Sequence, residues 1–102
     1  MFEVQLLIPF TDNQGVTFDA PAHAAFEQFV MDRFGGISRW PGEVTGSWQD
    51  QRQVYRDATR CYVVAVRTIR HGNLIGEVVD FAKAHYEQEA IYIRYLGLSE
   101  IL

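Results

Sequence analysis

The three histidines, His23, His71 and His85, are the side chains best suited to act as a base or to bind a metal near neutral pH. No two of them stand four residues apart, and the single cysteine, Cys61, is distant from them along the chain. Because zinc sites need such spacing, we expect no metal site and no cofactor. His85 falls on the apolar side of a predicted helix, where a structural histidine is more common than a catalytic one.

Motifs of the common enzyme classes are absent from the sequence. The serines lack the setting of a nucleophile elbow, and there is neither a phosphate-binding loop nor a dinucleotide fingerprint. Asp50 and Asp57 flank a predicted hairpin turn. Such carboxylates could serve acid–base chemistry, but turn aspartates usually bond their own backbone. The sequence therefore leans away from an enzyme.

Arginine is unevenly distributed along the chain. Seven of the eight arginines lie between Arg33 and Arg70, a segment that holds only three acidic residues and carries a charge of +4. Arginine binds carboxylate or phosphate through paired N–H groups, which lysine does not. One interpretation is a site for a small anion near the predicted hairpin. The more common alternative is cross-strand ion pairing and charge complementarity between subunits.

Two tryptophans, Trp40 and Trp48, lie close to Gly42 and Gly46. A glycine within a strand lets another group approach closely, so an indole beside it could line the mouth of a pocket. More often a tryptophan in this position covers one end of the core.

Six segments must position these residues. Alternating apolar residues predict strands, and apolar residues at helical spacing predict helices. Asp19 and Asn73 are the expected N-caps, and Gly35-Gly36 should end the first helix. In chain order we expect strand 2–8, helix 19–34, strand 43–49, strand 54–69, helix 73–88 and strand 91–95.

This β-α-β-β-α-β order resembles the ferredoxin-like α+β fold. The resemblance implies one domain over residues 1–102, with a four-stranded antiparallel sheet in the order 4-1-3-2 and both helices on one face. RNA-recognition motifs of this fold carry an aromatic and basic third strand, which residues 60–66 lack. Acylphosphatases carry an arginine in the first loop, which residues 11–18 lack. Dimeric α+β barrel enzymes keep His, Trp or Asn in a pocket, and Trp48, His85 and Arg60 are candidates for that role.

A second resemblance covers residues 34–90. Phe34-Gly35-Gly36, Gly46-Ser47-Trp48 and Gln88-Glu89-Ala90, together with Val54 and Asp57, are similar to a pattern in small uncharacterised bacterial proteins. That pattern implies a bacterial origin and carries no assigned chemistry.

The face of the sheet opposite the helices is the most informative surface. Val4, Leu6 and Ile8 should point toward the helices, and on the third strand Cys61, Val63 and Ala65 suit close contact beneath them. The outer face would then carry Leu7, Tyr62, Val64, Val66 and Tyr92, with Arg60 and Arg94. Exposed apolar patches usually mark protein contacts, so we expect a homodimer interface there. A ligand cleft is the alternative, and the candidate ligand-binding residues are Trp48, Arg60, Tyr62, His85, Tyr92 and Arg94.

Composition and charge limit the partners. The formal charge of −4 and the pI of about 5.2 argue against binding nucleic acid. A single cysteine fits a reducing compartment. With no signal peptide and no apolar stretch long enough to span a membrane, we expect a cytoplasmic protein that does not bind membranes.

The sequence thus predicts a small homodimeric binding or interaction module without catalysis of its own. The alternative is a small cofactor-free enzyme of the dimeric α+β barrel kind, acting on an anionic or aromatic small molecule.

Overall fold

The computed structural model describes residues 2–98. Five strands and two helices follow one another along the chain. They are β1 (Phe2–Pro9), α1 (Ala20–Phe34), β2 (Ser38–Arg39), β3 (Val44–Asp50), β4 (Gln53–Val66), α2 (Ile69–His85) and β5 (Tyr92–Leu98).

The strands form one antiparallel sheet in which β1 lies between β4 and β5. The other edge of β4 carries two partners, because this strand is 14 residues long. The short β2 pairs with Tyr62 and Val63, and β3 pairs with residues 53–59. The ferredoxin-like α+β prediction and its strand order are confirmed, and β2 is an addition within a segment that the sequence predicted as a loop.

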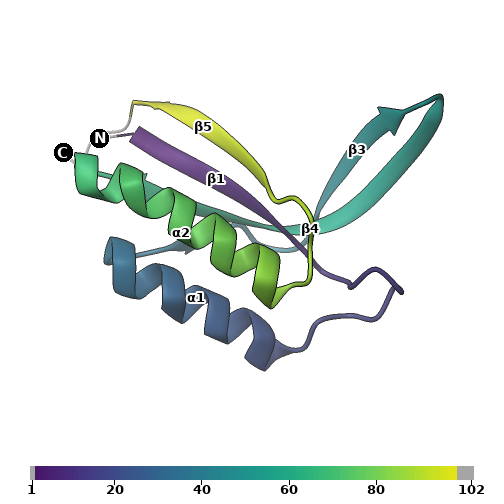
Figure 1. Ribbon diagram of the computed structural model, residues 1–102, viewed down its shortest axis with the longest axis horizontal. Helices are drawn as coiled ribbons and strands as arrows, with labels where there is room; N and C mark the ends of the chain where they lie inside the picture. The colour runs from purple at the N-terminus through teal and green to yellow at the C-terminus, as the bar shows by residue number, and fades with distance from the viewer. Residues whose placement is uncertain (1, 99–102) are drawn as a thin grey trace.

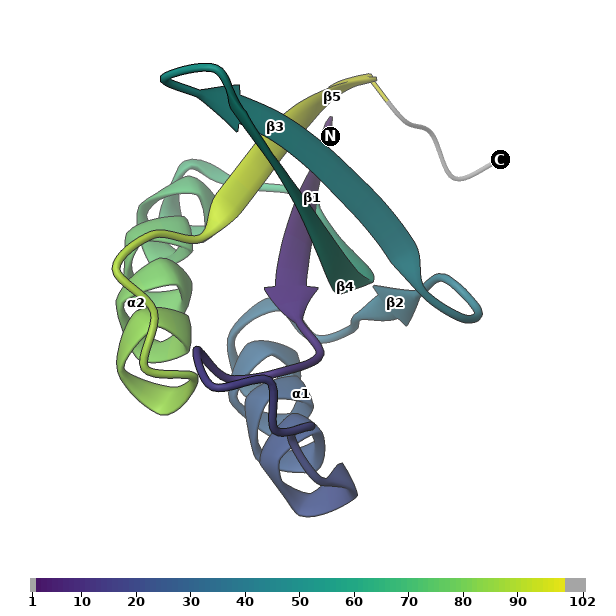
Figure 2. The same ribbon diagram turned by 90° about the vertical axis from the view of Figure 1, so that its right-hand side faces the viewer.

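Both helices pack on the same face of the sheet (Figure 1, Figure 2). Asp19 begins α1 by accepting a hydrogen bond from the Ala22 N–H at 2.9 Å, and Gly35 ends it with a left-handed φ of 76°. Thr68, not Asn73, caps α2 by accepting from the His71 N–H at 3.1 Å. The second helix therefore starts about four residues earlier than predicted, and β4 ends at Val66.

The prediction of which β4 side chains face the helices was wrong. Val64 stands opposite Val4 and Tyr62 opposite Leu6, so each pair points to the same side of the sheet. Tyr62, Val64 and Val66 are buried in the core against the helices. Cys61, Val63 and Ala65 therefore lie on the outer face, with Leu7 and Tyr92. Because β4 is apolar on both sides, only its register with β1 decides the orientation.

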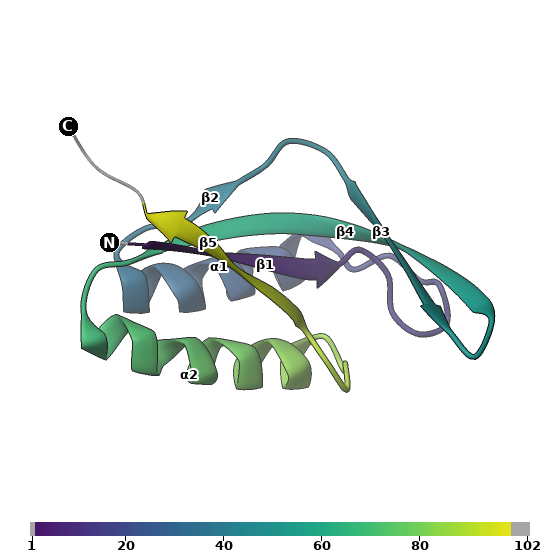
Figure 3. The same ribbon diagram turned by 90° about the horizontal axis from the view of Figure 1, so that it is seen from above.

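The paired strands β3 and β4 extend past the helix layer as a twisted hairpin (Figure 1, Figure 3). We refer to residues 44–59 as the hairpin arm. At its tip Gln51 and Arg52 both have positive φ, 48° and 67°, as a two-residue type I′ turn requires. The arm stands beside the outer face of the sheet and helps to shape the surface described next.

Candidate functional site

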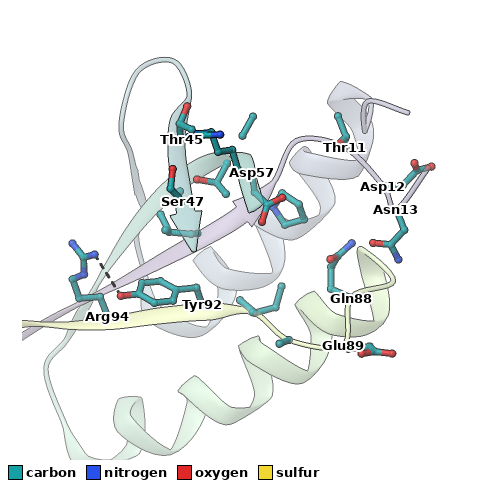
Figure 4. A pocket seen from close by; sticks show the side chains of 18 residues that line it. Thr11, Asp12, Asn13, Thr45, Ser47, Asp57, Gln88, Glu89, Tyr92 and Arg94 are labelled. Atoms are coloured by element: carbon teal, nitrogen blue, oxygen red, sulfur yellow. Dashed lines mark hydrogen bonds between the residues drawn. The ribbon is translucent and has the colours of Figure 1, made fainter. Parts of the chain in front are cut away.

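An open hollow of about 1190 Å³ lies beside the outer face of the sheet (Figure 4). Three segments that are distant in the sequence form its walls. They are the end of β1 with the loop after it, the hairpin arm, and the chain that leads into and along β5.

The wall from the outer face of the sheet holds Leu7, Tyr92 and Arg94. Leu7 is paired with Tyr92 across β1 and β5, so both side chains lie on the same face. Tyr92 keeps 55% of its surface exposed. The Arg94 Nη2 donates to the Tyr92 hydroxyl at 3.4 Å, and its guanidinium carbon lies 5.7 Å from the centre of that ring. Arginine and tyrosine thus contact each other at the solvent-accessible wall of the hollow.

The hairpin arm supplies hydroxyl and carboxylate groups. Thr45, Ser47 and Asp57 lie along this wall (Figure 4). Thr59 ties the two strands of the arm together, because its hydroxyl donates to the Val44 carbonyl at 2.7 Å. The arm therefore holds its polar side chains on regular strands.

The remaining wall is made by the loop after β1 and by the residues before β5. An Asp12 carboxylate oxygen accepts from the N–H groups of Gln14 and Val16, both at 2.9 Å, which closes the loop as a turn. Asn13 donates to the Glu87 carbonyl at 3.4 Å and so connects the two segments. The Gln88 amide donates to the Tyr86 carbonyl at 3.0 Å.

The charge of the hollow is small. Its formally charged residues are three acids and two arginines, which leaves one net negative charge: Asp12, Asp57, Glu89, Arg56 and Arg94. Most other polar groups in the walls are neutral hydroxyls and amides. Such a lining can donate to and accept from an uncharged ligand. Across residues 2–98, no group of three or more His, Cys, Asp or Glu side chains is arranged to hold a metal ion.

Of the predicted ligand-binding residues whose side chains the structure describes, Tyr92 and Arg94 lie at the hollow. Trp48 belongs to the hairpin arm, where its backbone pairs with Tyr55. The anion site expected from the arginine distribution does not form as one cluster. Of the seven arginines between residues 33 and 70, only Arg56 lines the hollow.

Arg60 and Tyr62 come together on the helix side of the sheet. The Arg60 Nη1 donates to the Tyr62 hydroxyl at 3.3 Å and approaches the Glu27 carboxylate at 3.9 Å. Arg39, from β2, reaches the same carboxylate at 3.9 Å. Burial raises the pKa of Tyr62, so its hydroxyl stays protonated and available to neighbours. This group ties β4 and β2 to α1.

His23 is the functional candidate that sequence analysis missed. It is 2% exposed, and its Nδ1 is 2.8 Å from the Tyr86 hydroxyl. Burial, aided by the positive charge of Arg60, lowers the pKa of His23 to about 4. Its Nε2 has no hydrogen-bond partner within residues 2–98. The spacing of His23 from the core residues Phe26 and Val30 is the signal that predicts its buried position.

His85 has a structural contact, as the sequence indicated. Its Nε2 lies 2.7 Å from the Ala22 carbonyl, which joins the end of α2 to the first turn of α1. The rings of His85 and Tyr86 meet edge to face, with 4.9 Å between their centres. Of the predicted trio of Trp48, His85 and Arg60, the last two lie on the helix side of the sheet.

The segments of the bacterial pattern meet at the hollow. Gly46-Ser47, Asp57 and Gln88-Glu89-Ala90 all line it. Phe34-Gly35-Gly36 instead forms the C-terminal end of α1, where Gly35 caps the helix. One part of the pattern therefore ends helix α1, and three other parts line the hollow.

No protein-family model matches this chain, and no curated protein sequence matches it. Solved structures do match. A divalent cation tolerance protein, CutA1, from Thermus thermophilus is 16% identical, with 99% of this chain and 86% of that chain covered and a TM-score of 0.68. The periplasmic divalent cation tolerance protein CutA from Archaeoglobus fulgidus is 10% identical, with coverage of 99% and 86% and a TM-score of 0.66.

A phage SAM lyase in complex with S-methyl-5′-thioadenosine is 9% identical, with 92% of this chain and 78% of that chain covered and a TM-score of 0.67. At these identities the likeness shows the fold. The chain thus has the ferredoxin-like fold found in the CutA proteins. No helix within the described residues is long and apolar enough to cross a membrane.

Proposed function

We propose that this chain is a cytoplasmic homo-oligomeric module that binds a small organic molecule in the hollow, without catalysis of its own. The hollow is the observation that carries the proposal, because it joins an exposed aromatic side chain, charged groups and neutral polar groups on rigid strands. A reducing compartment suits the buried free thiol of Cys61, although one structural neighbour is described as periplasmic.

Self-association is supported by the outer face of the sheet. Its partly exposed apolar side chains include Leu7, Val63 and Ala65, and no helix covers this face within residues 2–98. A second copy that pairs face to face would bury this patch. The proposed homodimer interface no longer includes Tyr62, Val64 and Val66, because these residues are buried in the core. Leu7 remains in it, whereas Tyr92 is assigned to the hollow, where 55% of its surface is exposed.

The structural neighbours point to two kinds of ligand, a divalent cation and a nucleoside thioether. A cation is the less favoured of the two here, because residues 2–98 hold no cluster of three suitable ligands. An organic ligand suits the aromatic and hydroxyl groups of the hollow.

The interface is tested by static light scattering after size exclusion. The wild-type chain should have at least twice the mass of one 11.7 kDa protomer. Leu7→Asp should reduce that mass to the mass of one protomer, because a carboxylate on the outer face opposes burial. Met31→Asp is the matched control, since Met31 is 42% exposed on α1, on the other side of the molecule. A monomeric wild-type chain would contradict the proposal.

Ligand binding is tested by thermal unfolding with adenosine, glucose, glutamate, citrate and benzoate. At least one compound should raise the melting temperature. Ser47→Trp should reduce the rise by placing a bulky indole at the arm wall of the hollow, and Gln49→Trp, on the same strand but outside the hollow, should retain it. If no compound stabilises the wild-type chain, the hollow is not a binding site for small organic molecules.

A small cofactor-free enzyme is the second candidate function. The observation that bears on it is the Nε2 of His23, which has no partner within residues 2–98. His23 is 2% exposed and does not line the hollow, so a substrate would have to reach it from another side. If this candidate is right, mass spectrometry of the five compounds after incubation should find a product that His23→Gln fails to make. Unchanged compounds would oppose it.

A further inference from the structure

We infer that the hollow binds a nucleoside, meaning a flat aromatic base joined to a hydroxylated sugar without a phosphate chain. This inference rests on the proposed ligand-binding function and names the class of its ligand. Three properties of the hollow support it: an exposed aromatic platform at one end, neutral hydrogen-bonding groups along the walls, and a charge that disfavours polyanions.

The platform is the pair Tyr92 and Arg94. Tyr92 exposes 55% of its surface and lies on β5 at the wall of the hollow. The Arg94 guanidinium contacts this ring and its hydroxyl. Nucleic acid bases stack on exposed tyrosine rings and on the planes of arginine side chains. A base at this end would use both surfaces.

The rest of the hollow suits the sugar and the edge of the base. Figure 4 shows Ser47 and Thr45 on the arm and Gln88 on the opposite side. Hydroxyl and amide groups donate and accept at the same site, as the hydroxyls of a sugar do. The volume of about 1190 Å³ exceeds the usual range of ligand pockets, roughly 300–1,000 Å³. A nucleoside therefore fits with room to spare.

The charge of the hollow separates a nucleoside from a nucleotide. Three carboxylates outnumber two guanidinium groups in the lining. A triphosphate would bring several negative charges into a hollow that already carries one net negative charge. Like charges placed together oppose binding strongly. We therefore expect adenosine to bind more tightly than ATP.

Isothermal titration with adenosine, ATP and ribose tests the inference. Adenosine should bind the wild-type chain, and ATP without added magnesium should bind roughly tenfold more weakly or not at all. Tyr92→Ala should weaken adenosine binding about tenfold through lost stacking, and Tyr92→Phe should stay within about twofold because the ring remains. Tyr95→Ala is the matched control, since Tyr95 is 66% exposed on the same strand but lies outside the hollow.

The failure of this inference differs from the failure of the proposed function. If glucose, glutamate, citrate or benzoate stabilises the chain through the hollow and adenosine does not bind, the site exists and the nucleoside class is wrong. Equal binding of ATP and adenosine would also overturn the charge argument. If none of the compounds binds, the proposed binding function falls as well.

Discussion

On the helix side of the sheet Tyr62 is fully buried, whereas on the other side Tyr92 keeps 55% of its surface exposed. The first tyrosine packs 5.4 Å from the ring of Phe26 and bonds to Arg60. The second contacts Arg94 at the wall of an open hollow. The same residue type thus stabilises the fold on one side and is available to a ligand or partner on the other. The comparison teaches that burial separates the two tyrosines: one belongs to the core, and the other is accessible on the outer face.

The largest effect is expected when the tyrosine on the buried side is truncated. Tyr62→Ala should lower the free energy of unfolding by roughly 3–5 kcal/mol, because it leaves a cavity beneath α1 and releases Arg60 from its partner. Urea unfolding followed by circular dichroism measures the change. Tyr95→Ala, at a tyrosine that is 66% exposed, should change it by less than about 0.5 kcal/mol. Similar losses for the two variants would contradict the division into a structural and an exposed side.

The second test uses the buried histidine. His23 has a pKa of about 4 in the folded chain and an ordinary pKa of 6.5 when exposed. Above pH 6.5 it is neutral in both states, so its packing contributes fully to stability. As the pH falls from 6.5 toward 4, the unfolded chain takes up a proton that the folded chain excludes, and the free energy of unfolding falls.

The free energy of unfolding should be lower at pH 4 than at pH 7 by on the order of 3 kcal/mol. Urea unfolding at a series of pH values measures it for the wild-type chain and for His23→Gln. The variant should lose this part of the pH dependence, whereas His71→Gln, at a histidine in the first turn of α2, should retain it. Parallel pH profiles for wild type and His23→Gln would show that burial of this histidine does not govern acid stability.

The helix side of the fold could be predicted from the sequence far better than the outer side. In β1, apolar Val4, Leu6 and Ile8 alternate with polar or more exposed residues, so their direction was evident. In β4 the alternating signal is lost between residues 61 and 66, and the wrong face was predicted. The correct face follows from pairing Leu6 with Tyr62, which is a property of two strands together.

The hollow could not be predicted as a site because its walls come together only in three dimensions. Asn13, Ser47 and Gln88 are far apart in the sequence and belong to three separate segments. No local spacing relates them, since their proximity depends on how the hairpin arm bends beside β5. Tyr92 and Arg94 were found because alternation on one strand placed them on the outer face. Local patterns therefore revealed one wall and missed the other two.

The smallest test concerns the hairpin arm, which forms one wall of the hollow and depends on its turn. Arg52 has a φ of 67°, which costs free energy for a residue with a side chain and none for glycine. Arg52→Gly should therefore raise the free energy of unfolding by roughly 0.5 kcal/mol. The reason is that glycine relieves the strain of the positive φ in the folded turn by more than it stabilises the unfolded chain through added conformational entropy. Gln53→Gly, at the first residue of β4, should lower it by a similar amount because glycine weakens a strand. Amide hydrogen exchange across residues 44–59 should slow in the first variant and quicken in the second. If both variants leave exchange unchanged, the turn does not control the order of the arm. In that case β4 alone holds this wall of the hollow in place.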